Sequence, residues 1–257
     1  MVALLAVFAC ERPRAEAASG GPKRIVSLAP SVTETLFALG AGDRVVGVTR
    51  FCDHPPEVAA RRKVGGLTDV DVEIVLSLKP DLVVGVQSAT AAPLQRTLQS
   101  AGIRFEFVDV ETLSDVAGSF QRLGTLVEAP EEARALAEAL ASRQISGAPD
   151  APKVLLLFGR DPWIGAGPGT FADEMIRSAG GRNALGALDT QYPTLDAERL
   201  STVEPDLVID TSFGDAPAEV PGGAPVVRLD PALIRPGPRL VQAMDVFQQS
   251  IAEVAAK

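Results

Sequence analysis

The chain has 257 residues and a formal net charge of −9, and hydrophobic residues make up 46% of it. This length accommodates one large domain or two of ordinary size, and the composition is typical of a globular protein. The negative charge disfavours nucleic acid as a partner, because phosphate binding requires clustered Lys and Arg. No apolar run in the sequence reaches the ~20 residues that span a bilayer.

The N-terminal segment 1–22 differs in kind from the rest of the chain. An apolar run from Val2 to Ala9 ends at Cys10, and charged and then small residues follow through Gly21. This pattern is typical of the end of a secretion signal, in which Cys10 is the candidate for lipidation. We expect a periplasmic protein or a membrane-anchored lipoprotein that faces outside the cytoplasm. The alternative is a disordered tail on a cytosolic protein.

Cysteine and histidine are scarce. The sequence has two cysteines, Cys10 and Cys52, and a single histidine, His54. Two cysteines, one of them in the candidate signal, form neither a disulfide framework nor a thiolate metal site. One histidine also disfavours a receptor for free zinc or manganese, which needs several His and carboxylate ligands together. We therefore expect no intrinsic cofactor.

From Arg24 onwards, apolar runs typical of strands alternate with segments of helical periodicity. We expect strands at 25–28, 45–48, 82–86, 105–108, 154–158, 207–209 and 226–229. We expect helices at 32–39, 56–61, 72–79, 91–101, 113–127, 130–145, 171–179, 197–204 and 238–255. This alternation predicts an α/β fold with mostly parallel sheets flanked by helices.

One motif occurs twice with identical internal spacing. Asp71-Val72-Glu73 leads to Pro80-Asp81, and Asp196-Ala197-Glu198 leads to Pro205-Asp206. In each copy the first Asp is suited to cap a short helix, and the Glu lies in the first turn of that helix. The proline then ends the helix before a buried strand. Two copies of one unit predict two similar lobes.

The middle of the chain predicts how these lobes are connected. Pro130, followed by two glutamates, is typical of a helix start, and the loop 147–152 is rich in Pro and Gly. We expect an N-terminal α/β lobe at 23–128, a bridging helix at 129–148 and a C-terminal α/β lobe at 149–257. Because one long helix joins the lobes, we expect a stiff hinge with a cleft between them.

The segment from Arg24 to Gly40, the segment Cys52-Asp53-His54-Pro55-Pro56 and the two Glu-containing repeats resemble periplasmic receptors for cobalamin, haem and iron–siderophores. The resemblance covers about residues 23–255. It implies two α/β lobes bridged by a long helix, and a non-enzymatic receptor that delivers its ligand to an ABC importer.

The resemblance also implies a role for Glu73 and Glu198. In the family, one carboxylate on the outer surface of each lobe meets arginines of the membrane permease, and these two residues fall on the matching positions. One oriented ion pair per lobe would register a two-fold partner, here a permease dimer in the inner membrane. The alternative is a solvated glutamate that only complements a helix dipole.

Ligand groups are expected beyond the carboxyl ends of the strands, because open α/β sheets bind ligands there. The candidate ligand-binding residues from these loops are Pro30, Ser31, Phe51, His54, Trp163, Phe213 and Arg235, and Tyr192 is added from a loop before the second Glu-containing repeat. Phe51 and Tyr192 match positions at which cobalamin receptors carry aromatic residues, whereas Leu67 departs from that pattern. Arg235 would meet a propionate or an amide of the ligand, or is a surface arginine.

His54 has two interpretations. It would act as an axial ligand to cobalt or iron carried by the bound molecule, or it is a loop histidine with local hydrogen bonds. The glycine-rich segment 165–170 lacks the ending of a phosphate-binding P-loop, and we expect it to be a tight turn.

The sequence therefore predicts a monomeric receptor for a cobalt corrinoid, cobalamin or a relative. Haem or a ferric siderophore is the alternative ligand for the same role. A nucleotide-dependent α/β enzyme is the rival class, disfavoured because the chain lacks a nucleophile elbow and a phosphate loop. A ligand sensor that works without a permease is the third alternative.

Overall fold

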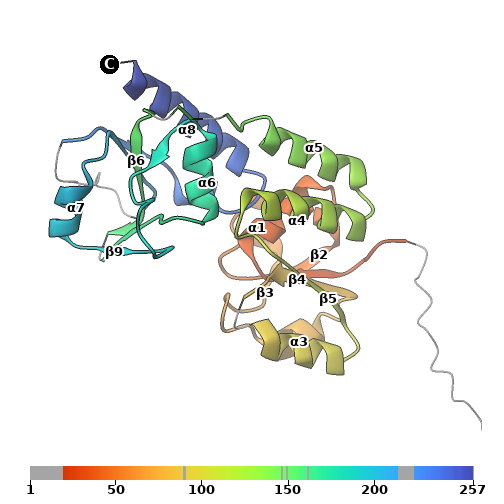
Figure 1. Ribbon diagram of the computed structural model, residues 1–257. Coiled ribbons are helices and arrows are strands. Elements are labelled where there is room, and N and C mark those ends of the chain that lie inside the picture. Colours follow the sequence, from red (N-terminus) through yellow and green to blue (C-terminus); the bar gives the residue numbers. More distant parts are fainter. Residues whose placement is uncertain are drawn as a thin grey trace, which may run out of the picture.

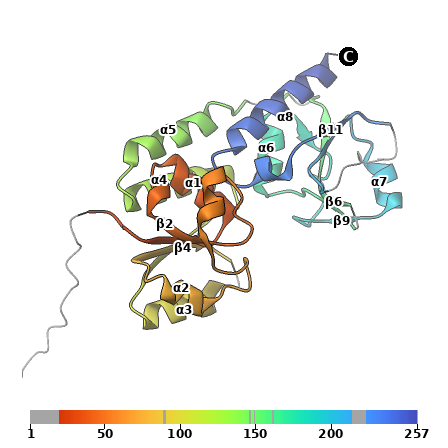
Figure 2. The same ribbon diagram turned by 180° about the vertical axis from the view of Figure 1, so that it is seen from behind.

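The computed structural model describes residues 20–88, 91–145, 147–148, 150–160, 162–213 and 223–256. It places two sheets side by side, each with its own helices (Figures 1 and 2). The expected lipidation site, Cys10, and the apolar run before it lie outside the described residues. None of the described helices is long and apolar enough to cross a membrane.

The first lobe contains a parallel five-stranded sheet in the order β3-β2-β1-β4-β5. Its strands are β1 (Ile25–Ser27), β2 (Val45–Val48), β3 (Arg62–Lys63), β4 (Leu82–Val86) and β5 (Arg104–Val108). Its helical elements are α1 (Pro30–Ala38), η1 (Gly42–Arg44), η2 (Pro56–Ala60), α2 (Val72–Ser77), α3 (Ala91–Ser100) and α4 (Leu113–Leu126). The alternation of strand and helix expected for this half is confirmed.

The two faces of the first sheet are covered by different helices (Figure 1). Successive strand residues point to opposite faces. Ile25 and Leu82 therefore belong to the buried cluster that includes α1 and α4, whereas Val26 and Val83 belong to the cluster under α2 and α3. The carboxyl ends of the strands are left for the loops that the sequence selected as ligand-binding segments.

The second lobe contains a sheet in the order β11-β10-β6-β7-β9, with β8 paired to β6. Its strands are β6 (Lys153–Arg160), β7 (Trp163–Gly165), β8 (Arg182–Asn183), β9 (Thr194–Leu195), β10 (Leu207–Asp210) and β11 (Val226–Arg228). Its helical elements are α6 (Phe171–Ser178), α7 (Ala197–Val203), η3 (Pro231–Ile234) and α8 (Leu240–Ala255). β8, β10 and β11 pair in parallel, whereas β7 pairs with both of its neighbours in the antiparallel sense.

The second sheet is therefore mixed rather than copied from the first. β6 turns back directly into β7, so that Gly165, expected in a loop, ends a strand. β7 and β9 are too short for period-2 alternation to show in the sequence, and this is why they were not predicted.

The repeated motif forms the same local structure in both lobes. The carboxylates of Asp71 and Asp196 accept the amide hydrogens of Ile74 and Arg199, at 3.0 and 2.7 Å. The first turns of α2 and α7 are thus capped as expected.

The two helices also end alike. Lys79 and Glu204, which precede the two prolines, both have positive φ angles, of 49° and 44°. After each proline, the Asp carboxylate accepts the backbone amide that starts the neighbouring strand segment, Lys23 for Asp81 and Lys153 for Asp206, each at 2.7 Å. These contacts support the interpretation of the motif as an internal repeat.

The helix expected to bridge the lobes is α5 (Pro130–Ala141), which packs along α4 and touches α8. It ends before the expected Ile145. After Ser142 the backbone tightens, and the amide of Ile145 donates instead to the carbonyl of Ser178 at 2.6 Å. The backbone therefore passes from α5 to a partner in the second lobe within a few residues of Ala141.

One buried apolar cluster runs through both lobes. It joins Ile25 and Leu36 of the first lobe to Leu156, Met175 and Phe247 of the second. Residues of α4 and α5 lie between these two groups in the same cluster. The lobes are therefore packed against each other as well as connected by the chain.

Candidate functional site

The lobes approach each other closely where α1 begins. Ser31, in the first turn of α1, is buried, and Pro30 before it is half-buried. A Cβ atom at Gly237 would lie 3.3 Å from the backbone and the Cβ atom of Ser31. This contact brings the segment between η3 and α8 against the carboxyl end of β1, which is the edge expected to bind ligand.

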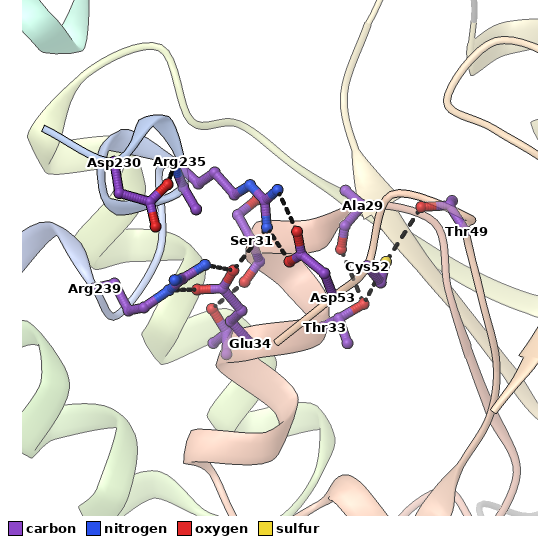
Figure 3. Close-up of polar contacts among 12 residues, drawn as sticks. Ala29, Ser31, Thr33, Glu34, Thr49, Cys52, Asp53, Asp230, Arg235 and Arg239 are labelled. Carbon is purple, nitrogen blue, oxygen red and sulfur yellow. Dashed lines mark hydrogen bonds and ion pairs between the residues drawn. The ribbon is translucent and has the colours of Figure 1, made fainter. Parts of the chain in front are cut away.

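Arg235 makes an ion pair across this boundary (Figure 3). It follows η3, and its two terminal nitrogens donate to the two carboxylate oxygens of Asp53, at 2.5 and 3.0 Å. Asp53 lies on the loop after β2, in the candidate ligand segment of the first lobe. The side chain of Arg235 is 24% exposed and that of Asp53 is 61% exposed, so the carboxylate is the more accessible partner.

A second pair lies deeper. Arg239, at the start of α8, donates to both oxygens of Glu34, at 2.8 and 2.6 Å (Figure 3). The Glu34 side chain is only 3% exposed. Arg235 also reaches Glu34, at 3.4 Å. Two carboxylates of the first lobe thus balance two guanidinium groups of the second.

Glu34, Asp53, Arg235 and Arg239 form a network that we name the four-residue cluster, and its contacts change the ionisation of Asp53 and Arg235. The hydrogen bond from Arg235 lowers the pKa of Asp53, and burial opposes this shift. The same hydrogen bond raises the pKa of Arg235. Both groups are therefore held in their charged forms.

Sequence reasoning selected Arg235 and missed the other three residues as functional groups. Glu34 offered one local sign, because it is the only charged residue between Ile25 and Gly42. A charge in an apolar helix needs a buried partner. The identity of that partner, Arg239, has no local signature.

The loop after β2 is held in place by small polar groups. The hydroxyl of Thr33 lies 2.8 Å from that of Ser27 and 3.1 Å from the buried thiol of Cys52. Thr49 contacts the same thiol at 3.2 Å, and the Lys63 ammonium donates to the carbonyl of Cys52 at 3.0 Å. The loop thereby presents Phe51, Asp53 and His54 at the surface from a fixed base.

The aromatic candidates occupy different surroundings. Phe51 is 45% exposed, and the Arg50 guanidinium stacks 4.9 Å from its ring centre. Tyr192 is also 45% exposed, and it packs on Phe158 with 5.9 Å between ring centres. Phe213 is 82% exposed and belongs to the loop after β10. Each lobe therefore offers accessible aromatic surface.

Trp163 is less accessible than these exposed rings. Its side chain is half-buried and packs on the cluster formed by Leu155, Leu195 and Leu200. That cluster lies between the second sheet and α7. The structure thus places Trp163 mainly in the packing of the second lobe.

The pKa of Tyr192 depends on its burial and on a charge in the first lobe. Burial raises the pKa of its hydroxyl, and the negative charge of Glu111 raises it further. Glu111 follows β5 of the first lobe, whereas Tyr192 precedes β9 of the second. A charge of the first lobe therefore acts on a hydroxyl of the second.

His54 is exposed, next to Asp53 on the loop after β2. No hydrogen bond from its ring is found within the described part of the chain. Among those same described residues, no group of three or more His, Cys, Asp and Glu side chains is arranged to hold a metal ion.

A cavity lies in the first lobe at the carboxyl ends of β1 and β4. Its volume is about 780 Å³, and its walls include Leu28, Ala29, Leu67 and Phe107. Leu67 is 54% exposed at its rim. An apolar cavity of this size is typical of a small-molecule site.

The corresponding edge of the second lobe carries a charged group. Asp210, at the end of β10, is fully buried and pairs with Arg160 at the end of β6, at 2.6 Å. The Ser212 hydroxyl donates to the same carboxylate at 2.5 Å. Burial alone would raise the pKa of Asp210, but these hydrogen bonds lower it below its usual value.

The two candidate docking residues are both exposed. Glu73 lies in the first turn of α2, and Glu198 lies in the first turn of α7, in the other lobe. Each lies two residues after the capping Asp of its repeat. The two copies of the motif thus present equivalent carboxylates on different lobes.

Comparison with known proteins identifies the family. Residues 25–216 match the family described as periplasmic binding protein, and the chain belongs to it. A relative from Bacillus subtilis strain 168, an uncharacterised ABC transporter substrate-binding lipoprotein, YvrC, is 33% identical over 90% of this chain and 80% of its own. The vitamin B12-binding protein of Pectobacterium atrosepticum is 26% identical over 91% of this chain and 90% of its own.

Solved structures agree with this membership. The apo form of the periplasmic haem-binding protein RhuT from Roseiflexus sp. RS-1 is 27% identical, with a TM-score of 0.78 over 91% of this chain and all of that one. The expected two-lobed α/β fold is confirmed. So are the role as a substrate-binding protein of ABC importers, with a permease and a small molecule as partners, and the location outside the cytoplasm.

Proposed function

We propose that the protein captures a corrinoid, cobalamin or a relative, between its lobes and delivers it to an ABC importer. The observation that carries this choice is the pair of half-exposed aromatic rings, Phe51 and Tyr192, one on each lobe, in the segments after β2 and before β9. Flat rings on both sides suit a flat macrocycle, which is held by apolar packing and a few polar groups. The vitamin B12-binding relative supports the same choice.

The protein acts by binding alone in this proposal. Its family consists of substrate-binding proteins. The nucleotide-dependent enzyme is the rival, and turnover of any nucleotide would favour it. Recovery of the bound ligand in chemically unchanged form, checked by mass spectrometry after release, supports the binding role.

Delivery requires docking. We assign the contact with the permease to Glu73 and Glu198, because each is exposed at the start of a short helix and the two helices share one local structure. In this proposal a monomer, with lobes at 23–128 and 149–257 and a bridge at 129–148, meets a permease dimer. The packing between the lobes favours a small closing movement.

Haem or a ferric siderophore is the second candidate ligand. The similarity to RhuT, a haem-binding protein, favours haem within this class. The same two aromatic rings would pack on a porphyrin. The ligands differ at their edges, because a corrinoid carries neutral amides where haem carries two propionates.

The proposal is tested by calorimetric titration of the full-length chain with cyanocobalamin, cobinamide, haemin and a ferric siderophore. We expect saturable binding of the corrinoids. Binding of haemin or the siderophore without any corrinoid would keep the receptor role and overturn the ligand. In the same experiment, a corrinoid absorbance change that is lost in His54→Ala would show that this histidine ligates cobalt.

A further inference from the structure

Arg235, the cation that the second lobe presents at the ligand edge, already has an anionic partner. Arg235 is bound by both oxygens of Asp53, and Arg239 is bound by both oxygens of Glu34. The four-residue cluster is formally neutral. A ligand that enters at the loop after β2 therefore meets a paired arginine with a carboxylate in front of it.

The two carboxylates of the cluster differ in accessibility. The Glu34 side chain is 3% exposed and fixed in the interior, whereas that of Asp53 is 61% exposed. A ligand carboxylate that bound Arg235 would have to displace Asp53, because like charges around one guanidinium repel each other. A neutral amide would accept a hydrogen bond from the edge of the cluster without displacing it.

We propose that Asp53 is a selectivity residue that excludes carboxylate-bearing ligands by occupying Arg235. This inference rests on the proposed function, which it deepens: the ligand class is a macrocycle with neutral amide side chains. Removal of the Asp53 charge leaves Glu34 to face two arginines, and the cluster gains one positive charge. The site would then attract a carboxylate.

The test uses ligand pairs whose members share a macrocycle and differ in the charge of their side chains. The first pair is cyanocobalamin and a monocarboxylic acid derivative, in which one propionamide is hydrolysed. The second is haemin and its dimethyl ester. Affinities are measured for the wild-type chain and for Asp53→Asn, and the quantity compared is the ratio of the affinities within each pair.

We expect the wild type to prefer the neutral member, and Asp53→Asn to shift the ratio towards the carboxylate by about tenfold, or ~1.4 kcal/mol. Asp53→Glu, which keeps the charge, should retain the wild-type preference. An unchanged ratio in Asp53→Asn would overturn the proposal. The proposal would also be overturned if Asp53→Asn lowered the affinity for both ligands of a pair by the same factor, because that result indicates a purely structural role.

Glu131→Gln is the matched control. Glu131 is also exposed and also pairs with an arginine, Arg134, at 2.7 Å, but both residues belong to α5. In this control variant, the ratio of the affinities within each ligand pair should stay at the wild-type value. If Asp53→Asn does not fold, Arg235→Gln gives the opposite test, because it leaves the Asp53 charge unpaired and should strengthen the preference for the neutral ligand.

The two proposals fail separately. If the wild type binds no corrinoid, the proposed function is wrong, and the haemin pair still measures whether Asp53 discriminates against carboxylates. If corrinoids bind but the ratio does not respond to Asp53→Asn, the receptor role stands and the selectivity role is wrong.

Discussion

The Glu34 carboxylate accepts two hydrogen bonds from the Arg239 guanidinium, although the two residues are 205 positions apart. One residue lies in α1, the first of the described helices, and the other at the start of α8, the last of them. The pair therefore ties the beginning of one lobe to the end of the other, next to the expected ligand edge.

Glu34→Gln should destabilise the protein by about 3 kcal/mol, because loss of one partner leaves a charge in the interior without compensation. Urea denaturation measures the effect. Glu131→Gln is the control: Glu131 is exposed and pairs with Arg134 on the surface of α5, so its loss should cost within ~0.5 kcal/mol. Equal costs for the two variants would contradict the structural role of the Glu34–Arg239 pair.

The stability of the protein should fall in acid partly through Asp210. The folded state holds this carboxyl at a lowered pKa, so the unfolded chain binds more protons as the pH falls. The contribution is complete above the unfolded pKa of about 3.9 and is lost as the pH falls through the lower folded value. Unfolding free energies measured from neutral to acid pH should show a flatter dependence in Asp210→Asn, and parallel curves would contradict this.

Replacement of both Glu73 and Glu198 by Ala should abolish uptake of the ligand in cells and leave its affinity for the purified protein unchanged. Each carboxylate offers charge-assisted hydrogen bonds to permease arginines. The control is the double variant Glu57→Ala/Glu132→Ala, which removes two other exposed first-turn acids. Normal uptake in Glu73→Ala/Glu198→Ala would contradict the docking role of these residues and favour a sensor that works without a permease.

Tyr192 should ionise above its usual pKa of about 10. Because it is the only tyrosine of the chain, the ultraviolet absorbance of tyrosinate during an alkaline titration reports on it alone. Burial is the main cause of the shift, and the charge of Glu111 is the second. Glu111→Gln should therefore lower this pKa towards the usual value, whereas Asp109→Asn should not. Equal responses would mean that Glu111 does not face Tyr192 across the lobes.

Local patterns in the sequence predicted most of the fold. The capping residues Asp71 and Asp196 and the prolines after them define two helix–strand units with a single geometry, and each feature acts within a few residues of itself. The repeat thus revealed the two lobes. β7 and β9 escaped prediction because strands of two or three residues leave no periodic pattern.

The candidate functional site was harder to predict from local patterns in the sequence. The strand-end rule found Ser31 and Arg235, which the structure brings into one region. The pairing of Arg235 with Asp53 depends on how one lobe packs on the other, across 182 positions of sequence. The strand-end rule also selected Trp163, and it does not distinguish a tryptophan that packs against the core from one that faces a ligand.

The apolar cluster that runs from Leu36 through Leu140 to Phe247 couples the stability of the two halves of the molecule. Each half also has a smaller cluster of its own, but the largest buried cluster contains residues of both. The protein should therefore melt in one cooperative step, with equal calorimetric and van't Hoff enthalpies. A destabilising substitution in the interior of one half should then lower the free energy of unfolding of the whole protein.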